Sequence, residues 1–322
     1  KSIKSIDSIK IKHVVDKNFE LAERVASDIG AIPYENLDKK IDCENFFITV
    51  PPKFRVQVFN SIKDYAKNII FEKPVTLTYD EAQYISNISR EKGINILVAQ
   101  TRRFFPNLVF SKEIFKVNSN SKITINAYEG ALFNWASESN YFNNDNPDDH
   151  GVFHDVGSHI FDFVVFFIES FFDFKDLSIE VITSKFDNTQ NSNNSYSRLL
   201  IKREGVEFDI KVRLSRSSNL SNMISITDDM NSRILTRSLM SRELKFIGNT
   251  DIISVPVKGI NSSFDLDDVF LNMWLDICNS IKTNSAKNSQ IGLDSVLNTV
   301  NLMQLLINKK EIDNKLKDTY YE

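Results

Sequence analysis

Glycine and cysteine are both scarce in this chain of 322 residues. There are nine glycines, and the closest two, Gly151 and Gly157, are six positions apart. A Gly-x-Gly-x-x-Gly turn, in which backbone amides surround a phosphate group, is therefore absent from this sequence. The two cysteines, Cys43 and Cys278, give neither a disulfide framework nor metal-site spacing. This cysteine usage fits a reducing compartment, so we expect a cytoplasmic protein.

Long apolar runs and a strong net charge are also missing. The most apolar segment, 160–174, is interrupted by Asp162, Glu169 and Asp173 and is too short to cross a bilayer. A net charge of −4 gives no reason to expect nucleic acid or an anionic membrane as a partner. With 42% hydrophobic and 25% charged residues, the composition is that of a soluble globular protein long enough for two domains.

The first hundred residues alternate between short apolar segments and amphipathic ones. Strands are expected at 11–15, 45–50, 68–71 and 94–99, and helices at 19–29, 54–67 and 78–92. Gly30 is a natural helix stop, and Thr78 with Glu81 forms a capping signal. A loop with one helical turn is expected at 34–41. Continuous apolar strands that alternate with helices predict a parallel sheet flanked by helices.

The pattern changes after about residue 105. A helix at 106–115, a long strand at 122–134, a polar loop at 135–150 and a helix at 151–170 come first. Seven segments between 177 and 257 then alternate, which predicts one large, mostly antiparallel sheet. Helices at 265–282 and 293–308 close the chain. We therefore predict an α/β domain over 1–104 and an α+β domain over 105–322, with the last helices packing back on the first domain.

Residues 151–162 (GVFHDVGSHIFD) contain a carboxylate and an imidazole at one-turn spacing. On a helix, Asp155 and His159 emerge on one face and can hold a proton between them. Gly157 lies between them and would let a ligand or another backbone approach. The opposite face is apolar and would anchor the helix in a core. From this segment alone, a structural Asp–His pair is the more common outcome.

A second candidate is Glu72-Lys73-Pro74, which directly follows an expected parallel strand. The carboxyl edge of such a sheet is where ligands bind, and Lys73 offers a positive charge and three donors there. The Lys73–Pro74 bond can be cis, which would aim Lys73 inward. An ordinary strand-to-helix turn is the competing interpretation.

Taken together, these segments resemble the glucose–fructose oxidoreductase, inositol dehydrogenase and rhizopine-catabolism (Gfo/Idh/MocA) family. The matching positions are Asp16, Thr49-Val50-Pro51-Pro52, Glu72-Lys73-Pro74, Arg102-Arg103-Phe104, and the set Gly151, Asp155, Gly157, His159 and Asp162. They extend over essentially the whole chain in the family's order. The resemblance implies a Rossmann-like nucleotide-binding domain at 1–104 and a substrate-binding and oligomerisation domain at 105–322.

The resemblance also implies an activity and cofactor contacts. The expected enzyme is an NAD(P)-dependent oxidoreductase that moves hydride to or from a carbinol or carbonyl carbon of a sugar, cyclitol or nucleotide-linked sugar. Asp16 would bond the adenosine ribose, which favours NAD, although Lys17 could tolerate the 2′-phosphate of NADP. The remaining cofactor contacts would be Thr49, Pro51, Pro52, Glu72 and Lys73.

On the substrate side, Lys73 would also bond the reacting oxygen, and His159 would be its general acid or base. Asp155 would orient His159 or bind a neighbouring hydroxyl. Arg102 and Arg103 would contact substrate or phosphate, or form surface ion pairs. Trp135, with Asn134 and Tyr141, would form a substrate wall or simply pack. A homo-oligomer is expected through the sheet of the second domain.

The sequence departs from the family at its start, because the glycine-rich turn is absent and 11–16 matches the family's second strand. A strand–turn–helix unit of roughly twenty residues is missing, which would leave two neighbouring strands with open edges. We favour a mis-set start over a degenerate relative, and over a piece supplied by another chain. The alternative function is an impaired relative with a binding or scaffold role.

A metal-dependent hydrolase is the third hypothesis, prompted by His150, His154, Asp155 and His159. It is the least favoured of the three, because His154 and His159 are five positions apart, about 140° around a helix, and cannot share a face. No metal is expected.

Overall fold

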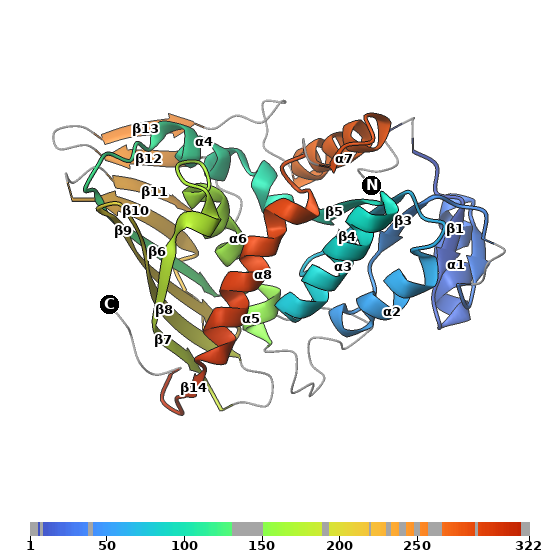
Figure 1. Ribbon diagram of the computed structural model, residues 1–322, viewed down its shortest axis with the longest axis horizontal. Helices are drawn as coiled ribbons and strands as arrows, with labels where there is room; N and C mark the ends of the chain where they lie inside the picture. Colours follow the sequence, from blue (N-terminus) through green and yellow to red (C-terminus); the bar gives the residue numbers. More distant parts are fainter. Residues whose placement is uncertain are drawn as a thin grey trace.

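The computed structural model describes residues 6, 9–37, 41–130, 151–188, 193–218, 220–229, 233–237, 243–247, 252–256, 266–286 and 289–316. In these residues the chain forms a parallel α/β part and a large mixed sheet backed by helices (Figure 1). The predicted fold class is confirmed. No helix among the described residues is long and apolar enough to span a bilayer.

The α/β part follows the predicted alternation closely. Its elements are β1 (His13–Val15), α1 (Phe19–Ile29), β2 (Ile32–Tyr34), β3 (Asn45–Ile48), α2 (Pro52–Ile62), β4 (Asn68–Glu72), α3 (Tyr79–Lys92) and β5 (Asn95–Ala99). All of its strand pairings are parallel. The strand β2 was not predicted, because a segment of three residues that includes Pro33 is too short to show a strand pattern. Its last residue, Tyr34, begins the loop expected at 34–41.

The parallel strands form two separate sheets, β1-β2 and β3-β4-β5. Within the described residues, β1 pairs only with β2 and β3 pairs only with β4, so each keeps one open edge. Ile32 and Phe47 in this region are 54% and 44% exposed. The predicted pair of open strand edges is confirmed.

Local signals set the ends of α1 and α3. Asn18 accepts a hydrogen bond from the Leu21 amide at 3.3 Å, and Gly30 ends α1 in the left-handed region at φ 70°. Thr78 and Glu81 form both hydrogen bonds of a capping box at the start of α3. Both predicted signals are confirmed.

The larger part is built on one sheet of nine strands. Its elements are η2 (Thr101–Phe104), α4 (Pro106–Ile114), β6 (Lys122–Gly130), α5 (Val152–Asp155), α6 (Gly157–Ile168), η4 (Phe174–Asp176), β7 (Ser178–Phe186), β8 (Asn194–Arg203), β9 (Val206–Ser215), β10 (Met223–Asp228), β11 (Arg233–Arg237), β12 (Glu243–Ile247), β13 (Ile252–Pro256), α7 (Leu266–Lys282), α8 (Leu293–Asn308) and β14 (Glu311–Ile312). The strand order is β13-β12-β11-β10-β6-β9-β8-β7-β14. Only the pairs β6–β9 and β7–β14 are parallel, as a mostly antiparallel sheet requires.

The helix predicted at 151–170 is in fact two helices, α5 and α6, which meet at Val156. Almost every side chain of α6 is buried, so the helix is central rather than amphipathic. Fully buried Phe161 and Phe167 each contribute roughly 1.5–3 kcal/mol to this packing. A Cβ placed on Gly157 would lie 3.0 Å from Leu214 Cδ1. Gly157 therefore admits a side chain of β9, not a ligand.

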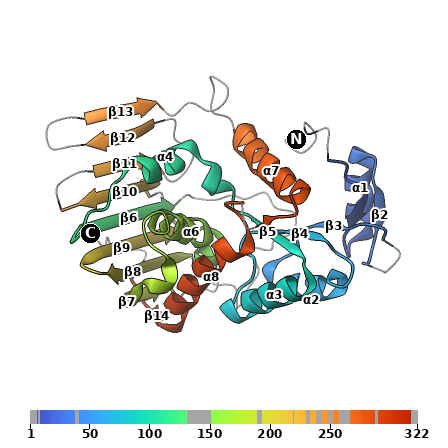
Figure 2. The same cartoon turned by 45° about the horizontal axis from the view of Figure 1, so that its top comes forward.

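The two C-terminal helices connect the two parts. Met273, Trp274 and Ile277 of α7 share a core with Ile70 and Leu97 of the parallel sheet. Leu293, Val296 and Val300 of α8 pack into the core beneath α3, and the rest of α8 contacts α6. Figure 2 shows α8 running between the parallel part and the large sheet. The boundary between 104 and 105 stays a prediction.

A buried ion pair joins η2, α6 and α8. Arg103 Nε and Nη2 donate to the Asp162 carboxylate at 2.8 and 2.7 Å, and both side chains are 1% exposed. Arg103 also donates to the Ser295 carbonyl at 2.9 Å, and Thr299 Oγ1 donates to Asp162 at 3.0 Å. These four residues are called the Arg103 cluster below.

Replacing Arg103 with methionine should lower the free energy of unfolding by about 3–5 kcal/mol, because Asp162 would be left charged and unpaired in the core. Urea denaturation at pH 7 measures this loss. The double variant Arg103→Met/Asp162→Leu should recover part of it, since neither charge then remains buried. A loss no larger than that of Lys67→Met, which breaks an exposed pair with Glu44, would contradict a stabilising role.

Candidate active site

The structure brings together Lys73, Asp155 and a third residue, Arg216, from three distant parts of the chain. Lys73 directly follows β4, Asp155 ends α5, and Arg216 directly follows β9. Lys73 Nζ donates to Asp155 Oδ1 at 2.9 Å and to the Asp155 carbonyl at 2.8 Å. Arg216 Nη2 donates to Asp155 Oδ2 at 2.6 Å. One carboxylate therefore joins the edge of the parallel sheet to the large sheet.

Arg55 donates hydrogen bonds to the backbone of the turn that carries Lys73. Arg55 is a buried residue of α2 and donates to the carbonyls of Glu72, Lys73 and Pro74, and to Val50 at 2.9 Å. The Lys73–Pro74 peptide bond is cis, the isomer considered from the sequence. One guanidinium thus fixes the backbone carbonyls on both sides of Lys73, so the backbone from which the Lys73 side chain extends is well held.

His159 lies beside these charges on the first turn of α6. Its Nδ1 is buried and has no hydrogen-bond partner among the described residues. Burial, and then the charges of Lys73 and Arg102, hold the pKa of His159 well below its usual value. The imidazole is therefore neutral at pH 7, and its Nδ1 is left without a partner by the residues that the structure describes.

The predicted proton-sharing pair of Asp155 and His159 is not formed. Both carboxylate oxygens of Asp155 bond cations, and His159 Nδ1 receives no bond from them. Burial acts to raise the pKa of Asp155, but Lys73 and Arg216 outweigh it and the pKa lies below its usual value. Two nearby cations compete more strongly for the carboxylate than a neutral imidazole does.

Glu72 has the opposite tendency. Burial raises the pKa of its carboxyl group, and the charges of Lys73 and Arg55 only partly oppose this. Glu72 and Asp155 are thus two acids near one ammonium, with pKa values moved apart by their surroundings.

The predicted cofactor-side residues lie at the carboxyl ends of parallel strands. Asp16 follows β1, and its Oδ1 accepts from the Asn18 amide at 2.9 Å. Thr49 is exposed just after β3, and Pro51 and Pro52 begin α2. These positions fit the ribose and nicotinamide ends of a dinucleotide. The sequence holds no glycine-rich turn for the pyrophosphate, so the fit is partial.

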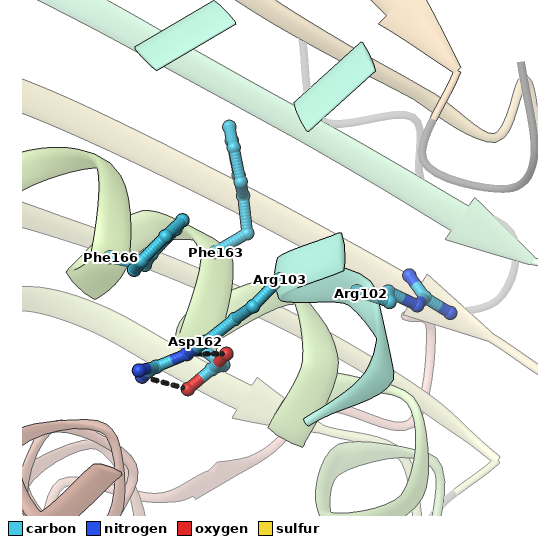
Figure 3. A pocket seen from close by; sticks show the side chains of 5 residues that line it. All are labelled: Arg102, Arg103, Asp162, Phe163 and Phe166. Carbon is cyan, nitrogen blue, oxygen red and sulfur yellow. Dashed lines mark hydrogen bonds and ion pairs between the residues drawn. The ribbon is translucent and has the colours of Figure 1, made fainter. Parts of the chain in front are cut away.

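Arg102 and Arg103 were expected on the surface or against substrate, and both form buried ion pairs instead. Arg102 bonds Glu129 of β6 through two nitrogens at 2.5 and 2.6 Å. Arg103 points away from Arg102 and toward Asp162, and it packs against Phe166 (Figure 3). The pocket of Figure 3 leaves no room for a water molecule. The surface-pair interpretation was wrong for both, because both guanidinium groups are buried. The substrate role of Arg103 stays a prediction.

Other predicted features lie elsewhere or outside the described residues. Trp135, Asn134, Tyr141 and His150 belong to 131–150, which the structure does not describe. A cavity of about 160 Å³ lies on the far side of Arg103, beside Lys112 and Glu169. In the described ranges, no three His, Cys, Asp or Glu side chains are arranged to hold a metal ion.

Sequence reasoning missed Arg55, Glu129 and Arg216. Arg55 shares a helix face with buried Phe59 and Ile62, and Glu129 continues the buried register of β6. A charge on an apolar face was therefore a usable signal for both. Arg216 gave no such signal, because it lies in a polar loop 61 residues from Asp155.

Comparison with known proteins connects this geometry to a family. Residues 2–100 match the family model GFO_IDH_MocA, described as "Oxidoreductase family, NAD-binding Rossmann fold". The match covers the parallel α/β part of the chain. The predicted family resemblance is confirmed over these residues.

Curated and solved relatives agree with this Gfo/Idh/MocA assignment. An uncharacterized oxidoreductase of Schizosaccharomyces pombe is 26% identical over 132 residues, which are 40% of this chain. The matched region spans only 36% of that relative's length. KijD10, a 3-ketoreductase from Actinomadura kijaniata in complex with NADP and TDP-benzene, superposes with a TM-score of 0.75 at 11% identity, covering 97% of this chain and 93% of KijD10.

A further solved structure has a similar fold. An oxidoreductase from Agrobacterium radiobacter in complex with NAD+, L-tartaric acid and magnesium gives a TM-score of 0.73 at 12% identity, covering 96% of this chain and 91% of that one. Both superpositions span the parallel part and the nine-stranded sheet, so the likeness in fold extends beyond the region matched by the family model.

Replacing His159 with glutamine should flatten the pH dependence of stability between pH 7 and 5. The unfolded chain protonates this histidine near pH 6.5, whereas the folded protein does not until much lower pH. The free energy of unfolding of the wild type therefore decreases as the pH is lowered from 7 to 5, by at most about 1.4 kcal/mol per pH unit for one proton. Urea unfolding at several pH values measures both proteins. Between pH 7.5 and 8.5 their difference should stay constant; parallel curves down to pH 5 would contradict the depressed pKa.

Proposed function

We propose that this protein is an NAD(P)-dependent oxidoreductase that transfers hydride to or from a carbinol or carbonyl carbon of a sugar, cyclitol or nucleotide-linked sugar. The main supporting observation is the position of Lys73: a partly buried ammonium at the carboxyl edge of a parallel sheet, fixed against Asp155 and close to neutral His159. The Gfo/Idh/MocA assignment of residues 2–100 supports the same activity.

In this proposal each of the three side chains has a distinct role. Lys73 donates to the reacting oxygen and stabilises the negative charge that develops on it. His159 is the proton acceptor, because its imidazole is neutral and Nδ1 is not bonded within the described residues. Asp155 keeps the ammonium in place. The bound cofactor supplies or accepts the hydride.

The cofactor contacts proposed are Asp16 at the adenosine ribose, Thr49, Pro51 and Pro52 along the cleft, and Glu72 beside the nicotinamide. Lys17 is exposed next to Asp16 and could bind the 2′-phosphate of NADP, so the proposal includes NADP as well as NAD. A solved complex of KijD10 contains NADP and that of the Agrobacterium relative contains NAD+, which supports the same range.

Substrate contacts and context complete the proposal. Arg102 and Trp135 remain proposed substrate neighbours, with Arg102 acting from its pair with Glu129. The outer face of the nine-stranded sheet is the proposed surface for a homo-oligomer. Free thiols at Cys43 and Cys278 support a cytoplasmic location.

A non-catalytic binding or scaffold protein is the alternative, and two observations favour it. This sequence has no glycine-rich turn, and the parallel strands of the described residues are divided between two sheets. Both features weaken the part of the site that would hold a pyrophosphate.

The first experiment is a fluorescence titration with NADH and NADPH. It uses this chain and the same chain extended at its start by a strand, a Gly-x-Gly-x-x-Gly turn and a helix. We expect binding by the extended chain at least. Lack of binding by both forms would establish the non-catalytic alternative.

Turnover by whichever form binds should depend on Lys73. With NAD+ or NADP+ and a free hexose, inositol or a nucleotide-linked hexose as probes, Lys73→Met should lower kcat by a factor of about 10²–10⁴, because the charge on the reacting oxygen loses its partner. Lys67→Met, which removes an exposed lysine just before β4, is the matched control and should retain activity. Equal rates for wild type and Lys73→Met would refute the proposed role.

A further inference from the structure

Three charges form a continuous chain between the two parts of the molecule. Asp155 accepts from Lys73 through Oδ1 at 2.9 Å and from Arg216 through Oδ2 at 2.6 Å. The side chains of Lys73 and Arg216 are each 14% exposed, and that of Asp155 is 26% exposed. Solvent and salt therefore screen these contacts much less than those of a surface pair.

The ammonium of Lys73 is directed by Asp155. Among the described residues, Lys73 Nζ donates two hydrogen bonds, and both end on Asp155, one on the side chain and one on the backbone carbonyl. That carbonyl also accepts from Ser158 Oγ at 2.9 Å. The backbone of Asp155 is therefore well held, whereas its carboxylate needs a contact on each oxygen to fix its rotation.

Arg216 supplies the second of these contacts. It lies in the loop directly after β9, far along the chain from β4 and from the turn that carries Lys73. We propose that Arg216 is a positioning residue: by holding Oδ2 of Asp155, it orients the carboxylate whose other oxygen places the Lys73 ammonium. This inference rests on the proposed function and adds a residue to the same site.

The charges around Asp155 support the arrangement. Burial acts to raise the pKa of Asp155, and Lys73 and Arg216 together bring it below its usual value. The charge of Asp155 in turn adds to the effect of burial in raising the pKa of Glu72. Without Arg216, a half-buried carboxylate would face one cation instead of two, its pKa would rise, and its contact with Lys73 would lose orientation.

The test compares Arg216→Gln, Arg216→Lys and a matched control, Arg198→Gln. Arg198 forms a two-nitrogen pair with Asp209 across β8 and β9, at 2.9 and 3.0 Å, and belongs to neither the proposed site nor its surroundings. The pKa of Asp155 is measured from its ¹³C carboxyl signal, which Asp155→Asn identifies. The ¹⁵N signal of the Lys73 ammonium is followed in the same samples.

Arg216→Gln should raise the pKa of Asp155 by about one unit or more and move the Lys73 signal. Its kcat should fall about tenfold or more with a smaller change in KM, because Lys73 is misplaced rather than lost. Arg216→Lys should shift both signals in the same direction by less and restore part of the rate. Arg198→Gln should leave all of these quantities unchanged. If Arg216→Gln does not fold, the smaller shifts of Arg216→Lys carry the test.

An unchanged Asp155 pKa and Lys73 signal in both Arg216 variants would overturn the proposal. So would a raised KM with unchanged kcat, which would make Arg216 a substrate contact. The NMR measurements need no substrate. If the wild type turns over none of the probes but Asp155 and Lys73 still respond to Arg216, the proposed function fails while the positioning role stands.

Discussion

Arg103 and Asp162 meet where neither side chain reaches solvent, and the arrangement of both halves depends on that contact. The pair connects η2, the segment that leaves the parallel sheet, to α6, which carries His159 on its first turn. Ser295 and Thr299 extend it to α8, which packs against α3 on one side and α6 on the other. A charge pair buried this deeply is stable only with nearly all its donors and acceptors bonded, so it specifies one relative placement of these elements.

The candidate site is a consequence of that placement. Lys73 lies on a turn that Arg55 fixes at the carboxyl end of β4, and Arg216 lies in the loop at the carboxyl end of β9, in the other sheet. Asp155, at the end of one helical turn, lies between them and bonds both. A carboxylate shared by two cations stays ionised, so the site keeps a fixed ammonium beside a histidine that burial keeps neutral.

This charge arrangement suits transfer of a proton and stabilisation of an oxyanion at one carbon centre. The region around the dinucleotide is less complete. Asp16, Thr49 and Lys73 follow the parallel strands β1, β3 and β4, but those strands lie in two sheets with open edges at β1 and β3 among the described residues. Proton chemistry and cofactor binding are thus separate properties of this fold, and each has its own structural support.

The sequence by itself determined the local elements and the identity of most of the site. Periodicity, capping at Thr78 and the stop at Gly30 placed most strands and helices within a few residues, because these signals act over a single turn or strand. Lys73, Asp155 and His159 were found from motif spacing. Only the tertiary structure decided their partners: Asp155 bonds Lys73 and Arg216 instead of His159, and Arg103 forms a buried pair with Asp162 of α6 instead of a surface pair. The physical reason is that an ion pair forms with the nearest available opposite charge in space, and Arg216 and Asp162 are brought close by packing that no local pattern records.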